Sequence, residues 1–147
     1  PPLPRARDGR RFDVRGQDVR LNPRMSLAIA MALQELATNA VKYGALSNPV
    51  GFVTIAWSSE KTHGHDPRLS FRWQEQDGPP VVKPKRRGFG SRLIERSLAR
   101  ELAGEVALTY ERTGVVCTID APVPPPGLLD RKSVAAPARI APLPLAG

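Results

Sequence analysis

The sequence predicts an α/β fold of two layers, in which helices cover one face of a mostly antiparallel mixed sheet. Two observations carry this prediction. The expected elements follow in the order strand, helix, strands, helix, strands, which suits helices packed on a single sheet. In addition, apolar and polar residues alternate along the strand segments, a pattern typical of strands that are buried on one side only.

The chain is long enough for one hydrophobic core, with 147 residues of which 41% are hydrophobic and 24% charged. Residues 1–10 are rich in Pro and Arg and are expected to be a linker or the start of a fragment, and residues 11–122 are expected to form the domain. The composition of the Pro/Ala-rich tail, residues 123–147, argues against a further packed element, and docking of its apolar residues Leu128, Leu129 and Ile140 is left open. No apolar run approaches the roughly 20 residues of a membrane span, so no membrane contact is expected. The single cysteine, Cys117, excludes an internal disulfide and favours the cytoplasm.

Short apolar stretches around the turn-like residues 16–18 predict one or two short strands at a sheet edge. Asn22 followed by Pro23 is typical of a helix start, and Gly44 is expected to end that helix after Tyr43. The remaining segments are predicted as half-buried strands over 53–57 and 69–74, an amphipathic helix over 93–102 that Gly104 terminates, and a hairpin over 106–110 and 115–119.

The long helix carries a carboxylate, an amide and an ammonium group on one side. With Glu35 at zero and about 100° per residue, Asn39 falls at about 40° and Lys42 at about 340°. Oxygen ligands beside a cation suit a polyphosphate that carries Mg²⁺. A solvated polar face has the same spacing, so the spacing alone leaves both interpretations open.

The sequence of this stretch, ELATNAVKYGALS, resembles the N box of the GHKL superfamily of ATP-binding domains, and specifically that of HWE-type sensor histidine kinases. The resemblance implies that Asn39 supplies an oxygen to Mg²⁺, that Lys42 contacts phosphate and that Tyr43 lies beside the nucleotide. Glu35 would orient or deprotonate the attacking group. The chain departs from the family at Gln34, where HWE kinases have His.

A second stretch, Trp73-Gln74-Glu75 followed by Gln76-Asp77-Gly78, resembles the HWE version of the G1 box. The resemblance implies that Glu75 accepts a hydrogen bond from the exocyclic amine of adenine. A carboxylate suits this role because it distinguishes an amino-purine from a keto-purine. Asp77, also expected at the nucleotide, stands where the family usually has glycine. Trp73 is expected to pack in the core as well.

The third stretch combines a basic segment, residues 81–87, with Gly88-Phe89-Gly90 and the predicted helix after it. Pro84 excludes a helix interior there and favours a mobile lid. Glycines before a helix let an anion approach its free amides, although Gly-x-Gly alone is usually a turn. In its place after the other two motifs, GFGSRLIERSLARELAGEV resembles the G2 box. The expected nucleotide contacts in it are Arg87, Gly88, Phe89, Gly90 and Leu93.

Together the three motifs imply the Bergerat ATP-binding fold over about residues 11–122. The implied activity is transfer of the γ-phosphoryl group of Mg²⁺-bound ATP to a histidine, with a response regulator downstream. In HWE kinases this histidine lies on a helical dimerisation domain, and no such helix precedes Asn22. The chain is therefore expected to be the catalytic domain of a larger kinase, or a stand-alone ATPase module. A P-loop enzyme is disfavoured because the sequence has no Walker A motif.

Individual features of the sequence suggest two other classes of function. A degenerate GHKL module that binds a partner without phosphotransfer is suggested by Gln34 and Asp77. A nucleic-acid-binding domain is suggested by the net charge of +8, but aromatic residues make up only 5% and no zinc-finger or RNP-like pattern is present. No nucleic-acid partner is therefore expected. His63 and His65 could bind a metal or accept a phosphoryl group, but their polar loop favours solvated side chains.

Overall fold

The computed structural model describes residues 10–61, 63–82, 93–124 and 138–140. Its elements are the strands β1 (Phe12–Arg15) and β2 (Val19–Leu21), the helix α1 (Pro23–Lys42), a 3₁₀ turn η1 (Ala45–Ser47), the strands β3 (Phe52–Glu60) and β4 (Arg68–Gln76), a π-helical turn η2 (Leu93–Leu98), the helix α3 (Ala99–Leu102), and the strands β5 (Glu105–Glu111), β6 (Gly114–Pro122) and β7 (Ala138–Ile140).

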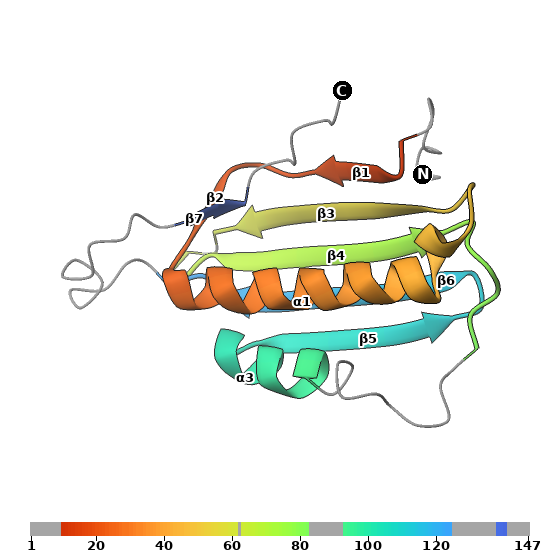
Figure 1. Ribbon diagram of the computed structural model, residues 1–147. Helices are drawn as coiled ribbons and strands as arrows, with labels where there is room; N and C mark the ends of the chain where they lie inside the picture. The colour runs from red at the N-terminus through yellow and green to blue at the C-terminus, as the bar shows by residue number, and fades with distance from the viewer. Residues whose placement is uncertain (1–9, 62, 83–92, 125–137, 141–147) are drawn as a thin grey trace.

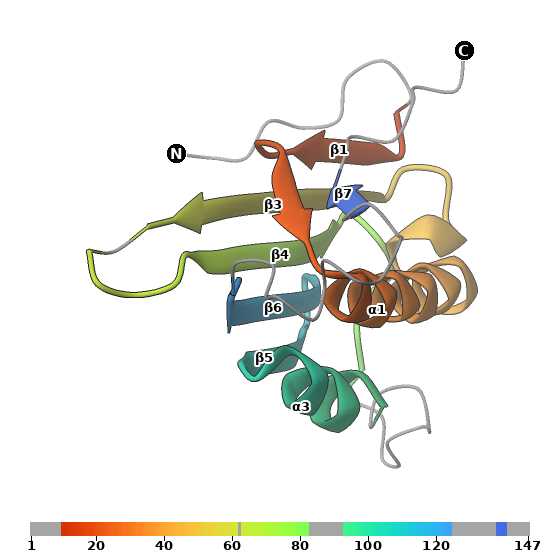
Figure 2. The same ribbon diagram turned by 90° about the vertical axis from the view of Figure 1, so that its left-hand side faces the viewer.

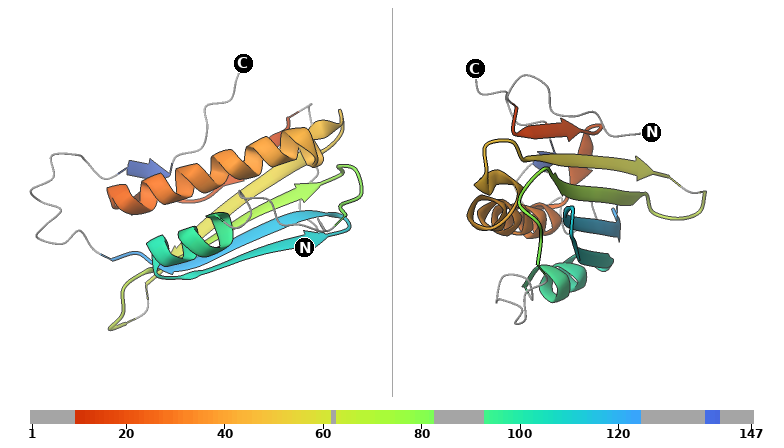
Figure 3. Two further views of the ribbon diagram at one scale, coloured as in Figure 1. Left: turned by 60° about the horizontal axis from the view of Figure 1, so that its bottom comes forward. Right: turned by 90° about the vertical axis from the view of Figure 1, so that its right-hand side faces the viewer.

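Five strands form one sheet in the order β1-β3-β4-β6-β5, with α1 and α3 on the same face (Figure 1). β1 pairs with β3 in parallel, and the other neighbours in this sheet are antiparallel. Figure 3 shows the two layers, with both helices lying over one side of the strands. The predicted fold class, a mostly antiparallel mixed sheet covered on one face by helices, is therefore confirmed.

The helix α1 begins where the sequence predicts it. The side-chain oxygen of Asn22 accepts a hydrogen bond of 2.8 Å from the backbone N–H of Met25, and Pro23 occupies the first helical position. This cap satisfies an amide that has no partner inside the helix. Five residues at intervals of three or four are buried against the sheet: Met25, Ile29, Ala32, Leu36 and Ala40.

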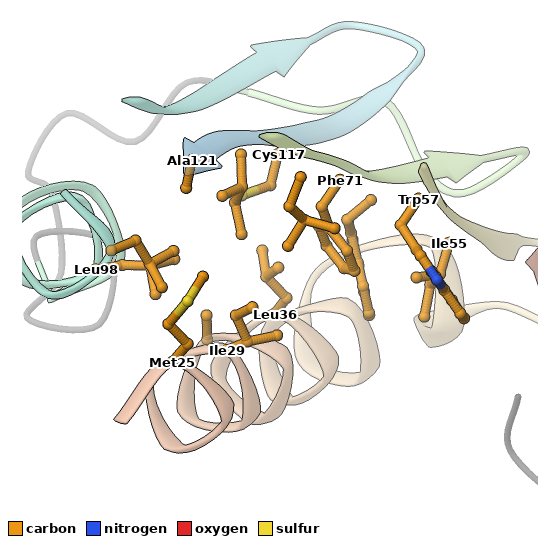
Figure 4. Packing of buried hydrophobic residues seen from close by; sticks show 14 of the residues in the cluster. Met25, Ile29, Leu36, Ile55, Trp57, Phe71, Leu98, Cys117 and Ala121 are labelled. Atoms are coloured by element: carbon orange, nitrogen blue, oxygen red, sulfur yellow. The ribbon is translucent and has the colours of Figure 1, made fainter. Parts of the chain in front are cut away.

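The core lies between these helices and the sheet. In Figure 4, Met25, Ile29 and Leu36 reach from α1 towards the strands that carry Phe71 and Cys117. Cys117 is fully buried, and this burial raises the pKa of its thiol to about 12. The thiol is therefore protonated at neutral pH and packs as a small apolar side chain.

The half-buried pattern predicted for β3 is only partly correct. Val53, Ile55 and Trp57 are buried as expected, but Thr54 on the opposite side of the strand is only 4% exposed. β3 lies inside the sheet, so Thr54 has Asp13 of β1 and Gln74 of β4 directly opposite. These neighbours cover a position that alternation alone assigns to solvent.

The second helical segment ends at Leu102, as predicted, but its first six residues form the π-helical turn η2 and only its last four form the α-helix α3. Ala103 takes the left-handed conformation, with φ 50°, and the N–H of Gly104 then bonds back to the carbonyl of Ala99. Gly104 is required for a different reason, because a Cβ at this position would lie 2.4 Å from the carbonyl oxygen of Asp120. The buried Leu98 and Leu102 confirm the predicted apolar face of this segment.

The expectation of no packed element after β6 is wrong at one place. Ala138–Ile140 forms β7, which pairs antiparallel with β2 in a separate two-stranded sheet beside the start of α1 (Figure 2). A three-residue strand is held by backbone hydrogen bonds, so it needs no side-chain periodicity that a sequence could display.

Within the described ranges, no helix combines the length and the apolar character needed to cross a bilayer.

Candidate functional site

Three polar side chains of the first motif lie on α1 outside its buried stripe. Glu35 and Asn39 are half-buried, and Lys42, in the last turn, is exposed. Among the residues that the structure describes, these side chains have no hydrogen-bond or ion-pair partner. The carboxylate, the amide and the ammonium group are therefore unpaired within the described part of the chain. Tyr43 follows directly and is 75% exposed.

Glu75 occupies the end of β4 and is the most deeply buried acidic group of the predicted site, with an exposed fraction of 4%. Its Oε1 accepts a hydrogen bond of 2.9 Å from the backbone N–H of Ala45, and its Oε2 accepts one of 3.1 Å from the indole of Trp73. Burial raises the pKa of Glu75, while these two hydrogen bonds act in the opposite direction. Each carboxylate oxygen keeps a lone pair for a further donor.

The segment after α1 packs directly on the end of β4. The side-chain amide of Asn48 donates to the carbonyl oxygen of Asp77 over 3.1 Å, and its Oδ1 accepts from the N–H groups of Val50 and Gly51. A Cβ on Gly78 would lie 2.5 Å from the Cα of Ala45, so this position requires glycine. The first and second motifs are thus joined into one unit.

Asp77 keeps the backbone conformation that glycine usually supplies. Its φ is 56°, in the left-handed region, and its side chain is exposed. Asp is one of the few residue types with a side chain that tolerates this region. The departure from the family pattern at Asp77 therefore leaves a glycine-like turn after β4.

One residue of this region was missed in the sequence. Arg11 donates from Nε to the carbonyl of Gly51 at 2.8 Å, and from Nη2 to the carbonyls of Asn48 at 2.6 Å and Ala45 at 3.3 Å. In the sequence its charge looks the same as that of its neighbour Arg10, which is exposed in the structure. Only the fold distinguishes the two arginines.

The third motif is described only in part. Arg87, Gly88, Phe89 and Gly90 lie outside the described residues, as does most of the predicted lid; Leu93 is the first residue of η2. Elsewhere, Gln34 is exposed on α1, and its carbonyl accepts a hydrogen bond from the Thr38 hydroxyl. His63 and His65 are exposed in the segment between β3 and β4, as expected from the sequence.

The chain has relatives among known proteins. No family model matches it. The blue-light-activated histidine kinase of Brucella ovis is 39% identical over 115 residues, which cover 78% of this chain and 23% of that protein. The protein of the same name from Brucella anthropi is 38% identical over the same shares. The chain thus spans less than a quarter of the length of these relatives.

Two solved structures show the same fold. The histidine kinase domain of the blue-light activated histidine kinase EL346 from Erythrobacter litoralis superposes with a TM-score of 0.59 at 24% identity, over 80% of this chain and 53% of that one. The histidine kinase domain of the E. coli osmosensor EnvZ gives a TM-score of 0.52 at 22% identity, over 80% and 78%. At these sequence identities, the two structures show that the fold is shared and nothing more.

The mixed sheet with both helices on one face is the fold that this chain shares with those two histidine kinase domains. Because the relatives at 38–39% identity are histidine kinases, the chain is related to a segment of this class of proteins.

Proposed function

We propose that this chain is the ATP-binding catalytic domain of a two-component sensor histidine kinase. It transfers the γ-phosphoryl group of Mg²⁺-bound ATP to a histidine on a separate dimerisation domain, and a response regulator receives the group afterwards. The observation that carries the proposal is the set of side chains on α1, Glu35, Asn39 and Lys42, which have no partner among the described residues and lie within the motif shared with kinases.

The donor set on α1 fits a magnesium-bound triphosphate. Mg²⁺ prefers oxygen ligands and takes only one or two of them from protein when phosphates supply the rest, so the side-chain oxygen of Asn39 suffices. When bound, the ion neutralises charge on the phosphate oxygens. Lys42 contacts phosphate, the exposed Tyr43 lies beside the nucleotide, and Glu35 orients or deprotonates the attacking imidazole.

At the other end of the site, Glu75 accepts a hydrogen bond from the adenine amine with a lone pair that its protein donors leave free. The low exposed fraction of Glu75 supports a recognition role, because a hydrogen bond shielded from water discriminates between bases more sharply than an exposed one. Asp77 shapes the adjoining turn. The nucleotide contacts of Arg87, Gly88, Phe89, Gly90 and Leu93 rest on the third motif alone.

The partners of the domain belong to the proposal as well. The curated relatives extend far beyond the matched region, which supports a parent protein that also carries the dimerisation domain. Those relatives are named for activation by blue light, and nothing in the matched region assigns a light sensor to this chain. The cytoplasmic location expected from the single cysteine remains a prediction.

A titration of the chain with ATP, with Mg²⁺ and then with EDTA, tests the proposal without the acceptor domain. Saturable binding that is lost on removing Mg²⁺ is expected, and no binding under either condition would overturn the proposal. Adding a helical acceptor domain should then produce phosphohistidine. Binding without transfer would favour a partner-binding module that has lost phosphotransfer.

A further inference from the structure

The guanidinium group of Arg11 closes the segment between α1 and β3. Its three hydrogen bonds reach the carbonyls of Ala45, Asn48 and Gly51, so they span seven residues of backbone. These carbonyls would otherwise need other donors, because the segment around them is neither helix nor strand after Ser47. One side chain thus gives residues 45–51, here named the linking loop, a single conformation.

The main chain of Arg11 is itself fixed by the sheet. Its carbonyl accepts a hydrogen bond of 2.9 Å from the N–H of Val53, where the pairing of β1 with β3 begins. The guanidinium group is therefore presented to the linking loop from a rigid edge. The planar guanidinium group holds its N–H donors in fixed directions on separate nitrogen atoms, whereas the three donors of a lysine ammonium group rotate about one nitrogen atom.

The linking loop in turn holds the two groups that shape the proposed adenine site. The N–H of Ala45 bonds to Oε1 of Glu75, and the side chain of Asn48 bonds to the carbonyl of Asp77. Ala45 and Asn48 are also two of the three residues whose carbonyls Arg11 binds. Displacing the loop would therefore move the donor that orients the Glu75 carboxylate.

We propose that Arg11 is a positioning residue of the nucleotide site, which acts through the linking loop to hold the Glu75 carboxylate in the orientation that selects adenine. The inference rests on the proposed function, because it assumes that Glu75 recognises the base. Arg11 touches no nucleotide in this scheme. Arg11 therefore affects the ratio of the dissociation constants for ATP and GTP. A purely structural role would not change that ratio.

The test compares dissociation constants for ATP and GTP in the 147-residue chain and in Arg11→Gln, Arg11→Lys and Arg10→Gln. Arg10→Gln is the matched control. It removes the same charge from the neighbouring residue, whose side chain is exposed. Arg11→Gln is expected to narrow the ATP preference by about tenfold, and Arg11→Lys by a similar factor, while Arg10→Gln leaves it unchanged. In a Glu75→Ala background, Arg11→Gln should change the ratio no further.

An unchanged ratio in folded Arg11→Gln or Arg11→Lys would overturn the inference, as would an equal effect of Arg10→Gln. If Arg11→Gln fails to fold, Arg11→Lys carries the test, together with hydrogen exchange of the Ala45 amide, which should accelerate more than the amides of α1. A parent chain that binds neither nucleotide would refute the proposed function itself. A parent chain that selects ATP while the Arg11 variants retain its selectivity would refute only the role of Arg11.

Discussion

The backbone N–H of Ala45 donates a hydrogen bond of 2.9 Å to Oε1 of Glu75, which joins the segment after α1 to the end of β4 across 30 residues of sequence. This contact brings the first and second motifs together. It also places a carboxylate, most of which the protein covers, at the junction of the two.

Glu75→Ala should narrow the preference for ATP over GTP by about tenfold, because the adenine amine loses an acceptor worth about 1.5 kcal/mol. The measurement is the ratio of the two dissociation constants. A general loosening of the site would weaken the binding of both nucleotides alike. The ratio of their dissociation constants therefore reports on the base contact alone. Unaltered selectivity would remove Glu75 from base recognition.

The burial of Glu75 also predicts a pH dependence of stability. Burial raises the pKa of Glu75 above the ordinary value of 4.5. At pH values between the pKa of the unfolded state and that of the folded state, the folded chain therefore keeps a proton that the unfolded chain has lost. The contribution of Glu75 to stability is then greatest below pH 4.5 and falls as pH rises through the folded-state pKa. Urea unfolding at a series of pH values gives the free energy of unfolding of the parent chain and of Glu75→Gln. The difference between these two free energies should change as pH rises through the folded-state pKa of Glu75.

Glu101 provides a control of opposite sign for the same experiment. Its pKa is lowered from 4.5, mainly by the hydrogen bond from Arg24 that links α3 to α1. The difference between the parent chain and Glu101→Gln should therefore be present above pH 4.5 and be lost at lower pH. The same trend for both variants would contradict the assigned pKa shift of Glu75.

Asn39→Ala should weaken binding of Mg²⁺-bound ATP by about tenfold or more, since the loss of one good ligand is worth on the order of 1.4 kcal/mol. Asn39 is half-buried without a side-chain partner among the described residues, so the melting temperature should change little. Gln34→His serves as the control, because Gln34 is exposed on another side of α1 and should leave affinity nearly unchanged. Equal affinity in Asn39→Ala and the parent chain would exclude Asn39 from the site.

The two ends of α3 predict opposite effects for one kind of substitution. Ala103→Gly should stabilise the fold by about 0.5–1 kcal/mol, because Ala103 is left-handed and glycine takes this conformation without a steric cost. Ala99→Gly, within the helical run that continues from η2 into α3, should destabilise the fold by about 1 kcal/mol. Both values come from urea unfolding, and a loss of stability in Ala103→Gly would contradict the left-handed cap.

The chain should bind ATP without phosphorylating itself. His63 and His65 are exposed between β3 and β4, whereas the proposed phosphate contacts come from α1 and the third motif. In-line attack requires reacting atoms within about 3–3.5 Å. After incubation with γ-labelled ATP, acid-labile and alkali-stable label should appear only on a supplied acceptor domain. Such label on this chain, abolished by replacing His63 or His65, would contradict the prediction.

The sequence alone determined the parts of this protein that depend on local interactions. Asn22 and Pro23 mark the start of α1, and the spacing of its apolar residues assigns one side to the core. That assignment places Glu35, Asn39 and Lys42 outside the core, because helix geometry relates residues three and four positions apart. The order and alternation of the strands likewise predict the layered sheet.

Tertiary structure alone decided the contacts between residues distant in sequence. Arg11 reaches carbonyls 34 to 40 residues away, and β7 pairs with β2 through three residues at the other end of the chain. The carbonyls that Arg11 binds and the groups that pair β7 with β2 belong to the backbone, which every residue type carries. No pattern of side chains in the sequence therefore predicts these contacts. Thr54 is buried for a related reason, since its cover comes from strands on either side. The sequence encodes which residues can bond, and the assembled sheet brings them within reach.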